Sequence, residues 1–68
     1  MDIKARLAKN LKRLRTERKL SQEAFAFEAG LHRTYISDIE RAARNPSIEI
    51  IDKLAAALKV KPGALLDD

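Results

Sequence analysis

The sequence contains no cysteine and only one histidine, and both shortages restrict its chemistry. Without cysteine there is no disulfide framework and no thiolate metal site, which argues against a secreted, disulfide-stapled scaffold and fits a reducing compartment. A single histidine also removes most other metal chemistry. We therefore expect neither a metal nor any other cofactor.

Glycine is almost equally scarce, with only Gly30 and Gly63 present. Two isolated glycines exclude the glycine-rich loops that cradle phosphates in nucleotide-dependent enzymes. No set of serine, histidine and aspartate suggests nucleophilic catalysis either. The sequence therefore predicts a protein that is not an enzyme, with no catalytic residues.

Long apolar runs and aromatic side chains are missing as well. No stretch approaches the roughly 18 apolar residues of a membrane span, and the first ten residues lack the apolar core of a signal peptide. Aromatic residues make up 4% of the chain, with no pair arranged as a stacking platform for single-stranded RNA. We expect one soluble, cytoplasmic domain over residues 1–68, because so short a chain supports only one core.

Charge is plentiful but unevenly distributed. The formal net charge is +4, and residues 1–19 alone hold eight basic and two acidic side chains. A basic segment attracts phosphate backbones irrespective of sequence, although solvated basic helix faces are also common. The charge pattern thus fits nucleic-acid binding without establishing it.

Apolar residues recur at helical spacing, and no segment alternates with the period of a strand. Caps and breakers predict five helices: from Asp2 to about Lys19, from Ser21 to Gly30, from about His32 to Arg41, from Ser47 to near Val60, and from Pro62 to Leu66. In the fourth helix the predicted inward stripe is Ile48, Ile51, Leu54, Ala55 and Leu58. The predicted fold is a compact all-α domain.

Two short helices joined at Gly30 form the most informative segment, about residues 21–41. Ala26 and Ala29 are small enough to let the helices cross closely, and glycine adopts the left-handed conformation that a tight turn requires. Ile36 and Ile39 are predicted to pack beneath them. The segment therefore predicts two helices that cross steeply.

The spacing of Ala26, Gly30, Ile36 and Ile39 resembles the helix-turn-helix of the Cro and phage-repressor (XRE) family. The phrases LRTERKLSQE, YISDIER and RNPSIEIIDKLAAALKV resemble that family over nearly the whole chain, and HRTYIS resembles especially the restriction-modification controller proteins. The resemblance implies a lambda-repressor-like domain, bacterial or phage-encoded, that regulates transcription by binding double-stranded operator DNA. Antitoxins and protein-binding modules share this fold and stay an alternative.

In that family the second helix of the motif lies in the major groove. With Ile36, Ile39 and Glu40 directed inward, the outward residues are Arg33, Thr34, Ser37, Asp38 and Arg41. The predicted base contacts are Arg33, Thr34, Ser37 and Asp38. Arg33 suits guanine O6 and N7, and Thr34 suits a thymine methyl or a base edge. Asp38 would repel DNA unless it accepts a hydrogen bond from a cytosine or orients Arg33 or Arg41.

A second set of residues is predicted to contact the DNA backbone. Gln22 begins a helix, where its amide and the free backbone N–H groups can meet a phosphate. The full set, in part implied by the resemblance, is Gln22, Tyr35, Arg41, Arg44 and Asn45. Tyr35 could instead be a half-buried packing residue, and Ser37 could contact a phosphate. His32, where the family often has serine, could cap the helix, touch DNA or do neither.

Arg15 and Glu40 are both predicted to lie at one interface. Arg15 follows Leu11 by four residues on the core stripe of the first helix, and Glu40 follows Ile36 by four on the inward face of the third. An unpaired buried charge is costly. We therefore predict an Arg15–Glu40 ion pair, with Arg18 as the alternative cation.

A homodimer is the remaining prediction, because one motif reads only a few base pairs and a small core gains stability from a partner. Ile50 lies between inward positions of the fourth helix, and Leu66 follows the predicted core residue Leu65. Exposed together, Ile50 and Leu66 would form an apolar patch for a second copy. Phe27 also lies between core positions and is expected either to cover the first helix or to contact a partner. No membrane or small-molecule ligand is expected as a partner.

Overall fold

The computed structural model describes residues 1–68, and every regular element in it is helical. The elements are α1 (Ile3–Glu17), α2 (Gln22–Ala29), α3 (Arg33–Glu40), α4 (Ile48–Leu58) and the 3-10 helix η1 (Pro62–Leu65). The four α-helices agree with the predicted ranges to within two residues. The fifth segment, predicted as a short helix through Leu66, is a 3-10 turn whose backbone bonds join residues three apart, so the domain has four α-helices rather than five.

Local capping explains where the helices begin and end. Asp2, Ser21 and Ser47 each accept a hydrogen bond from the backbone N–H three residues further on, at 2.8, 3.0 and 3.2 Å. Gly30 ends α2 in the left-handed region with φ of 72°, which lets the chain reverse into α3 after two residues. Among these caps, Gly30 is the one that shapes the short connection between α2 and α3.

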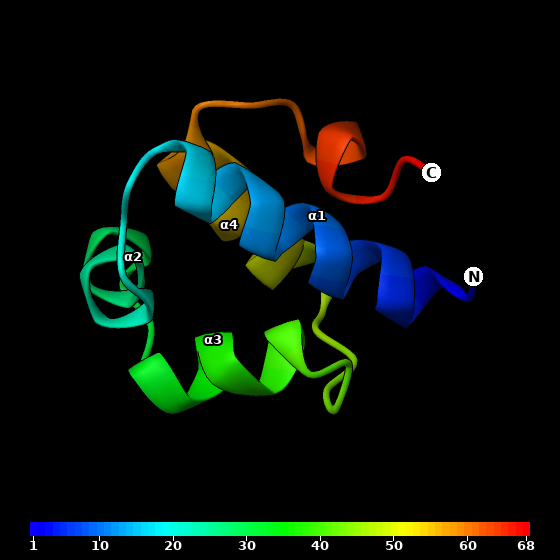
Figure 1. Ribbon diagram of the computed structural model, residues 1–68, viewed down its shortest axis with the longest axis horizontal. Coiled ribbons are helices and arrows are strands. Elements are labelled where there is room, and N and C mark those ends of the chain that lie inside the picture. Colours follow the sequence, from blue (N-terminus) through cyan, green and yellow to red (C-terminus); the bar gives the residue numbers. More distant parts are fainter.

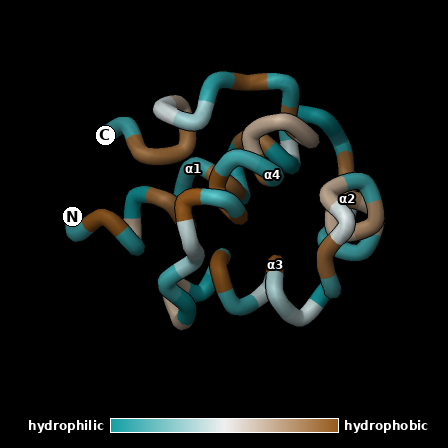
Figure 2. Tube along the Cα trace, turned by 180° about the vertical axis from the view of Figure 1, so that it is seen from behind, coloured by the Kyte–Doolittle hydropathy of each residue, from teal (hydrophilic) through white to brown (hydrophobic).

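The helices pack around one another in a body of 27 × 21 × 21 Å. Figure 1 shows α1 and α4 crossing at the centre, α2 at one end and α3 along the lower edge, with both chain termini at the opposite end from α2. The same arrangement is seen from behind in Figure 2, where hydrophobic and hydrophilic residues alternate along the helices. None of these helices combines the length and the apolar composition that a membrane-spanning helix needs.

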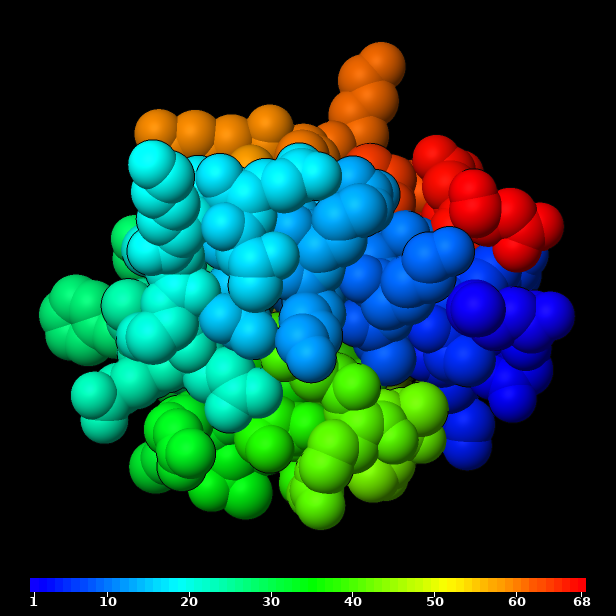
Figure 3. Space-filling view, in the orientation of Figure 1, coloured from blue at the N-terminus to red at the C-terminus, as the bar shows by residue number.

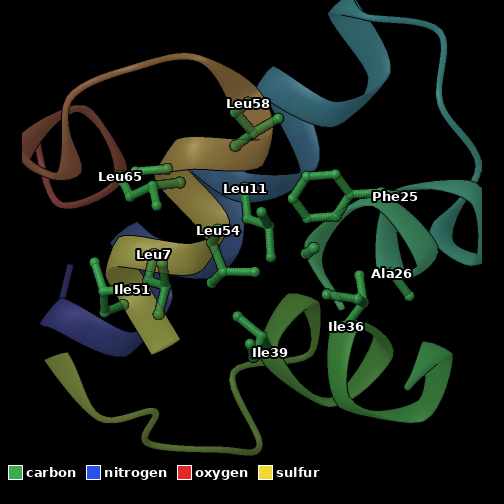
Figure 4. Close-up of a cluster of buried hydrophobic side chains, with 12 residues drawn as sticks. Leu7, Leu11, Phe25, Ala26, Ile36, Ile39, Ile51, Leu54, Leu58 and Leu65 are labelled. Carbon is green, nitrogen blue, oxygen red and sulfur yellow. The ribbon is translucent and has the colours of Figure 1, made fainter. Parts of the chain in front are cut away.

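Side chains from all five elements meet in one core (Figure 4). Its largest fully buried members are Phe25, Leu11, Ile36, Ile39, Leu54 and Leu65. Because α3 contributes Ile36 and Ile39 to this core, its orientation is fixed by the packing of the whole domain.

The apolar residues of α4 depart from the predicted pattern. Ile48 was expected to face inward, yet 86% of its surface is exposed. It occupies the first position of α4, where Ile3, Leu7, Ile51 and Leu66 line an open depression beside it instead of covering it. Ile50, in contrast, was expected to be exposed but is half-buried against the core, as is Leu66. The exposed apolar residue of α4 is therefore Ile48 and not Ile50.

The C-terminal segment is tied to α1 by polar contacts. The buried Asn10 side chain donates through Nδ2 to the carbonyl oxygens of Leu65, at 3.0 Å, and Asp67, at 2.7 Å. An exposed ion pair joins Arg6 Nη1 to Asp68 Oδ1 at 3.2 Å. These contacts hold η1 and the residues after it against α1.

Candidate nucleic-acid interface

The outward face of α3 is polar because its inward face is anchored in the core. Ile36 and Ile39 are 0% and 1% exposed, whereas Arg33 and Thr34 in the first turn are exposed. Figure 3 shows α3 and the loop after it, coloured green, forming one edge of the molecule below α1. This edge carries exposed side chains with hydrogen-bonding groups.

A buried charge network fixes α3 relative to α1 and α2. Arg15 donates through Nε and Nη2 to the two carboxylate oxygens of Glu40, at 2.6 and 2.9 Å, and both side chains are less than 10% exposed. Gln22 Nε2 donates to Glu40 Oε1 at 3.1 Å, and Arg15 Nη1 donates to the Leu20 carbonyl at 2.7 Å. The hydrogen bonds to Glu40 raise the pKa of Arg15, although burial opposes this shift.

Arg18, the alternative cation, is used elsewhere: it donates to the Ala57 carbonyl and lies 3.8 Å from a carboxylate oxygen of Glu28. The expected pair of Arg15 with Glu40 is thus present in the structure.

The sequence did not indicate that Gln22 would join this ion pair, because an amide at a helix start also fits simple capping. One amide N–H of Gln22 is committed to Glu40, and its Oε1 has no bond to the protein.

A second cluster lies at the C-terminal end of α3. Asp38 Oδ1 accepts a hydrogen bond from Arg41 Nη2, and Asp38 Oδ2 accepts one from Arg44 Nη2 at 3.1 Å. The Arg44 guanidinium also lies over the Tyr35 ring, 4.3 Å from its centroid. The hydrogen bonds from Arg41 and then Arg44 hold the pKa of Asp38 below its usual range, so the carboxylate is ionised at neutral pH.

The other residues predicted to contact DNA or a partner differ from one another in burial and in contacts. Asp38 contacts Arg41, as one alternative foresaw, and also Arg44, but not Arg33. Tyr35 is half-buried and packs against the core, while Ser37 is half-buried and Asn45 is exposed in the loop. His32 precedes α3 without a side-chain capping hydrogen bond, and Phe27 is 86% exposed rather than covering α1.

Arg44 and Tyr35 form a pair that sequence reasoning missed. The two residues are separated by the end of α3 and by Ala42, which takes the left-handed conformation with φ of 57°. Non-glycine residues rarely adopt this conformation, so the sequence carries no signal for the reversal that brings Arg44 back over the helix. The structure thereby gathers Tyr35, Asp38, Arg41 and Arg44 into one cluster on the polar edge.

Comparison with known proteins relates this arrangement to a family. The profile of the family HTH_3, described as helix-turn-helix, matches residues 11–65. The control protein C.BamHI of Bacillus amyloliquefaciens is 60% identical over 48 residues, which are 71% of this chain and 59% of that protein. The control protein C.MunI of a Mycoplasma species is 44% identical over 68 residues, covering 98% of this chain and 92% of that protein.

Solved structures give the same result. The restriction-modification controller protein C.AhdI of Aeromonas hydrophila superimposes with a TM-score of 0.88 at 44% identity, over 91% of this chain and 94% of that one. The controller protein C.Esp1396I, solved as a tetramer in complex with its natural 35 base-pair operator, superimposes with a TM-score of 0.87 at 31% identity, over 96% of this chain and 86% of that one. The chain therefore belongs to the HTH_3 helix-turn-helix family of DNA-binding transcription regulators, which are not enzymes.

Proposed function

We propose that this chain is a controller-type transcription regulator that binds a pseudo-palindromic DNA operator as a homodimer, within the cytoplasm of a bacterial host. The observation that carries the proposal is the two-sided character of α3, with Ile36 and Ile39 buried and Arg33 and Thr34 exposed on the opposite face. An α-helix presented in this way fits the major groove of B-DNA. Residues 1–68 act as one lambda-repressor-like domain, with the helix-turn-helix over about residues 21–41.

Arg33 and Thr34 are the main base-reading residues in this proposal. Both lie in the first turn of α3, and the N-terminal residues of a recognition helix contact base edges. Arg33 offers the paired donors that match guanine O6 and N7, and Thr34 offers a methyl group and a hydroxyl. Ser37, one turn further along, reaches a base edge or a neighbouring phosphate.

Phosphate contacts position the domain on the duplex. Gln22 is the first residue of α2. One N–H of its side-chain amide is bonded to Glu40, and its Oε1 is an acceptor that cannot bind a phosphate. The second amide N–H and the unpaired backbone N–H groups at the start of α2 can donate to a phosphate. On the other side of α3, Asn45, Arg41, Arg44 and the Tyr35 hydroxyl provide further donors. Contacts at both ends of the motif would fix the depth and angle of α3 in the groove.

The second copy docks on the depression whose apolar lining is Ile3, Leu7, Ile48, Ile51 and Leu66. Lys4, Asn45 and Pro46 complete the lining, so Asn45 lies where the proposed dimer surface meets the proposed DNA surface. Ile48 is 86% exposed and lines the depression together with Leu66, so a second copy would remove the exposed surface of Ile48 from water. Leu66 keeps the role in the interface that the sequence suggested, and Ile48 takes the place of Ile50. Two-fold symmetry would set the reading helices about 34 Å apart, one turn of DNA.

Selection of bound sites from a pool of random duplexes tests the proposal as a whole. We expect a consensus with two related half-sites whose centres are about one helical turn apart. The same protein should migrate as a dimer on one duplex in sedimentation experiments. Failure to enrich any duplex sequence would refute DNA recognition, and enrichment of a single isolated half-site would refute the dimeric arrangement.

A further inference from the structure

The cluster at the end of α3 places a negative charge where the proposed function requires positive ones. Asp38 lies on the polar edge between Tyr35 and Arg41, and DNA approaching this edge brings its own negative phosphates. A carboxylate here opposes binding unless it has a separate role. DNA binding alone therefore does not explain why an aspartate occupies this position.

Helix stability does not explain the residue. Asp38 is in the last turn of α3, where the helix macrodipole is negative and a carboxylate is unfavourable. Its side chain does not cap the helix, because its two oxygens accept hydrogen bonds from Arg41 and Arg44. The side chain thus serves the two arginines rather than the helix.

Asp38 holds both arginines at the surface. The Asp38 side chain is 17% exposed, whereas those of Arg41 and Arg44 are 67% and 44% exposed. Arg44 is held at a second point by the Tyr35 ring, with its guanidinium 4.3 Å from the ring centroid. In the free protein, Nη2 of each guanidinium therefore donates to a carboxylate of the same chain, while the remaining N–H donors stay at the surface.

Resting on the proposed function, we propose that Asp38 is a specificity-determining residue that keeps Arg41 and Arg44 from the phosphates of DNA other than the operator. On random DNA the arginines stay paired with Asp38 and release few counterions. On the operator, a cytosine amino group donates to Asp38 in their place, and the arginines turn to the phosphates. This exchange of partners makes the affinity of Arg41 and Arg44 for the DNA backbone depend on whether a cytosine contacts Asp38.

The test measures binding to a random-sequence duplex at several potassium chloride concentrations, by fluorescence anisotropy. Asp38→Asn keeps the shape of the side chain but removes its charge. We expect its affinity for random DNA to rise roughly threefold to tenfold, since exposed ion pairs are weak. The slope of log affinity against log salt should steepen by about 1 to 2, because each freed arginine that meets a phosphate adds about 0.9.

Glu17→Gln is the matched control, because Glu17 also pairs with an arginine, Arg13, at 3.3 Å, on the exposed surface of α1. It removes the same charge and should leave the salt slope unchanged. Arg44→Gln is the third variant. In the parent protein it should change the affinity for random DNA little, because Asp38 still pairs with Arg44. In the Asp38→Asn background it should lower the affinity for random DNA. On a selected operator, Arg44→Gln should weaken binding in both.

The outcomes separate this inference from the proposed function. A parent protein that binds no duplex would refute the proposed function. Weaker binding of Asp38→Asn to random DNA would show that Asp38 positions the arginines for phosphate contacts. An unchanged salt slope would show that Asp38 does not keep the arginines from the phosphates. Either result overturns the inference while leaving DNA binding intact. Circular dichroism melting of each variant verifies that α3 is still folded.

Discussion

Glu40 receives more hydrogen bonds than any other side chain at the contact between α3 and the rest of the domain. Its two oxygens accept from Arg15 Nε, Arg15 Nη2 and Gln22 Nε2. Glu40→Gln replaces one acceptor oxygen by a donor that faces other donors, and it leaves Arg15 without a counter-charge. We expect a loss of roughly 1–3 kcal/mol in the free energy of unfolding.

Urea denaturation followed by circular dichroism measures this loss. Glu17→Gln breaks an exposed pair on α1 and should cost less than about 1 kcal/mol. Equal denaturation midpoints for the two variants would show that the buried pair contributes no more than the surface pair.

Arg33 is expected to determine sequence preference at one position of each half-site. Arg33→Ala should lower affinity for the operator by about 1–3 kcal/mol and relax the preference at that base pair, because a base contact carries sequence information. Asn45→Ala should weaken binding to operator and random DNA alike, because a phosphate contact does not. Site selection with each variant provides the measurement. A loss for Arg33→Ala that is the same on random DNA would assign Arg33 to the backbone.

The C-terminal segment, from η1 to Asp68, depends on a side chain of α1. Asn10 donates to the Leu65 and Asp67 carbonyls, so Asn10→Ala leaves two acceptors without their partner. We expect a cost of roughly 1–3 kcal/mol and faster hydrogen exchange in η1. The proposed dimer should weaken too, because Leu66 lines the proposed interface.

Arg6→Gln is the control for Asn10, since it removes the ion pair with the exposed Asp68 and leaves both Asn10 hydrogen bonds in place. This variant should exchange and dimerise like the parent. If Asn10→Ala also behaves like the parent, the C-terminal segment is held by the buried Leu65 alone.

The elements were predictable where their signals are local. Asp2, Ser21 and Ser47 cap helices through hydrogen bonds that span three residues, and Gly30 ends α2 through its own backbone preference. Such contacts depend on the residue type at fixed spacing. The helix ranges could therefore be predicted from the sequence alone.

The exposure of single residues was less predictable because it depends on distant neighbours. Ile48 has the spacing of the inward stripe, but Ile3 and Leu66 line the depression beside it and leave its side chain exposed. The Asn10 contacts were missed because their acceptors are backbone carbonyls, which every residue carries. The Arg15–Glu40 pair could be anticipated, since buried charges need partners and few were available.

For the whole molecule, the property to measure is the affinity of the proposed homodimer. Ile48→Glu places a charge in the proposed interface, and it should yield a monomer at micromolar concentration in sedimentation equilibrium. Phe27→Glu is a matched control, because Phe27 on α2 is also 86% exposed but lies outside the depression. Its dimer should persist. Dimerisation of Ile48→Glu equal to that of the parent would exclude the depression as the interface.

The ends of the chain lie together, next to the proposed interface. Arg6 and Asp68 form an ion pair, and Ile3 and Leu66 line the same depression. Two copies joined in tandem by a short flexible linker would therefore meet at an effective concentration of the order of millimolar. Such a fused pair would occupy its operator without first assembling, and its response to dose would lose the steepness that assembly provides. Coexpressed with a reporter, the fused pair should therefore respond to its own concentration less steeply than the proposed dimer of separate copies.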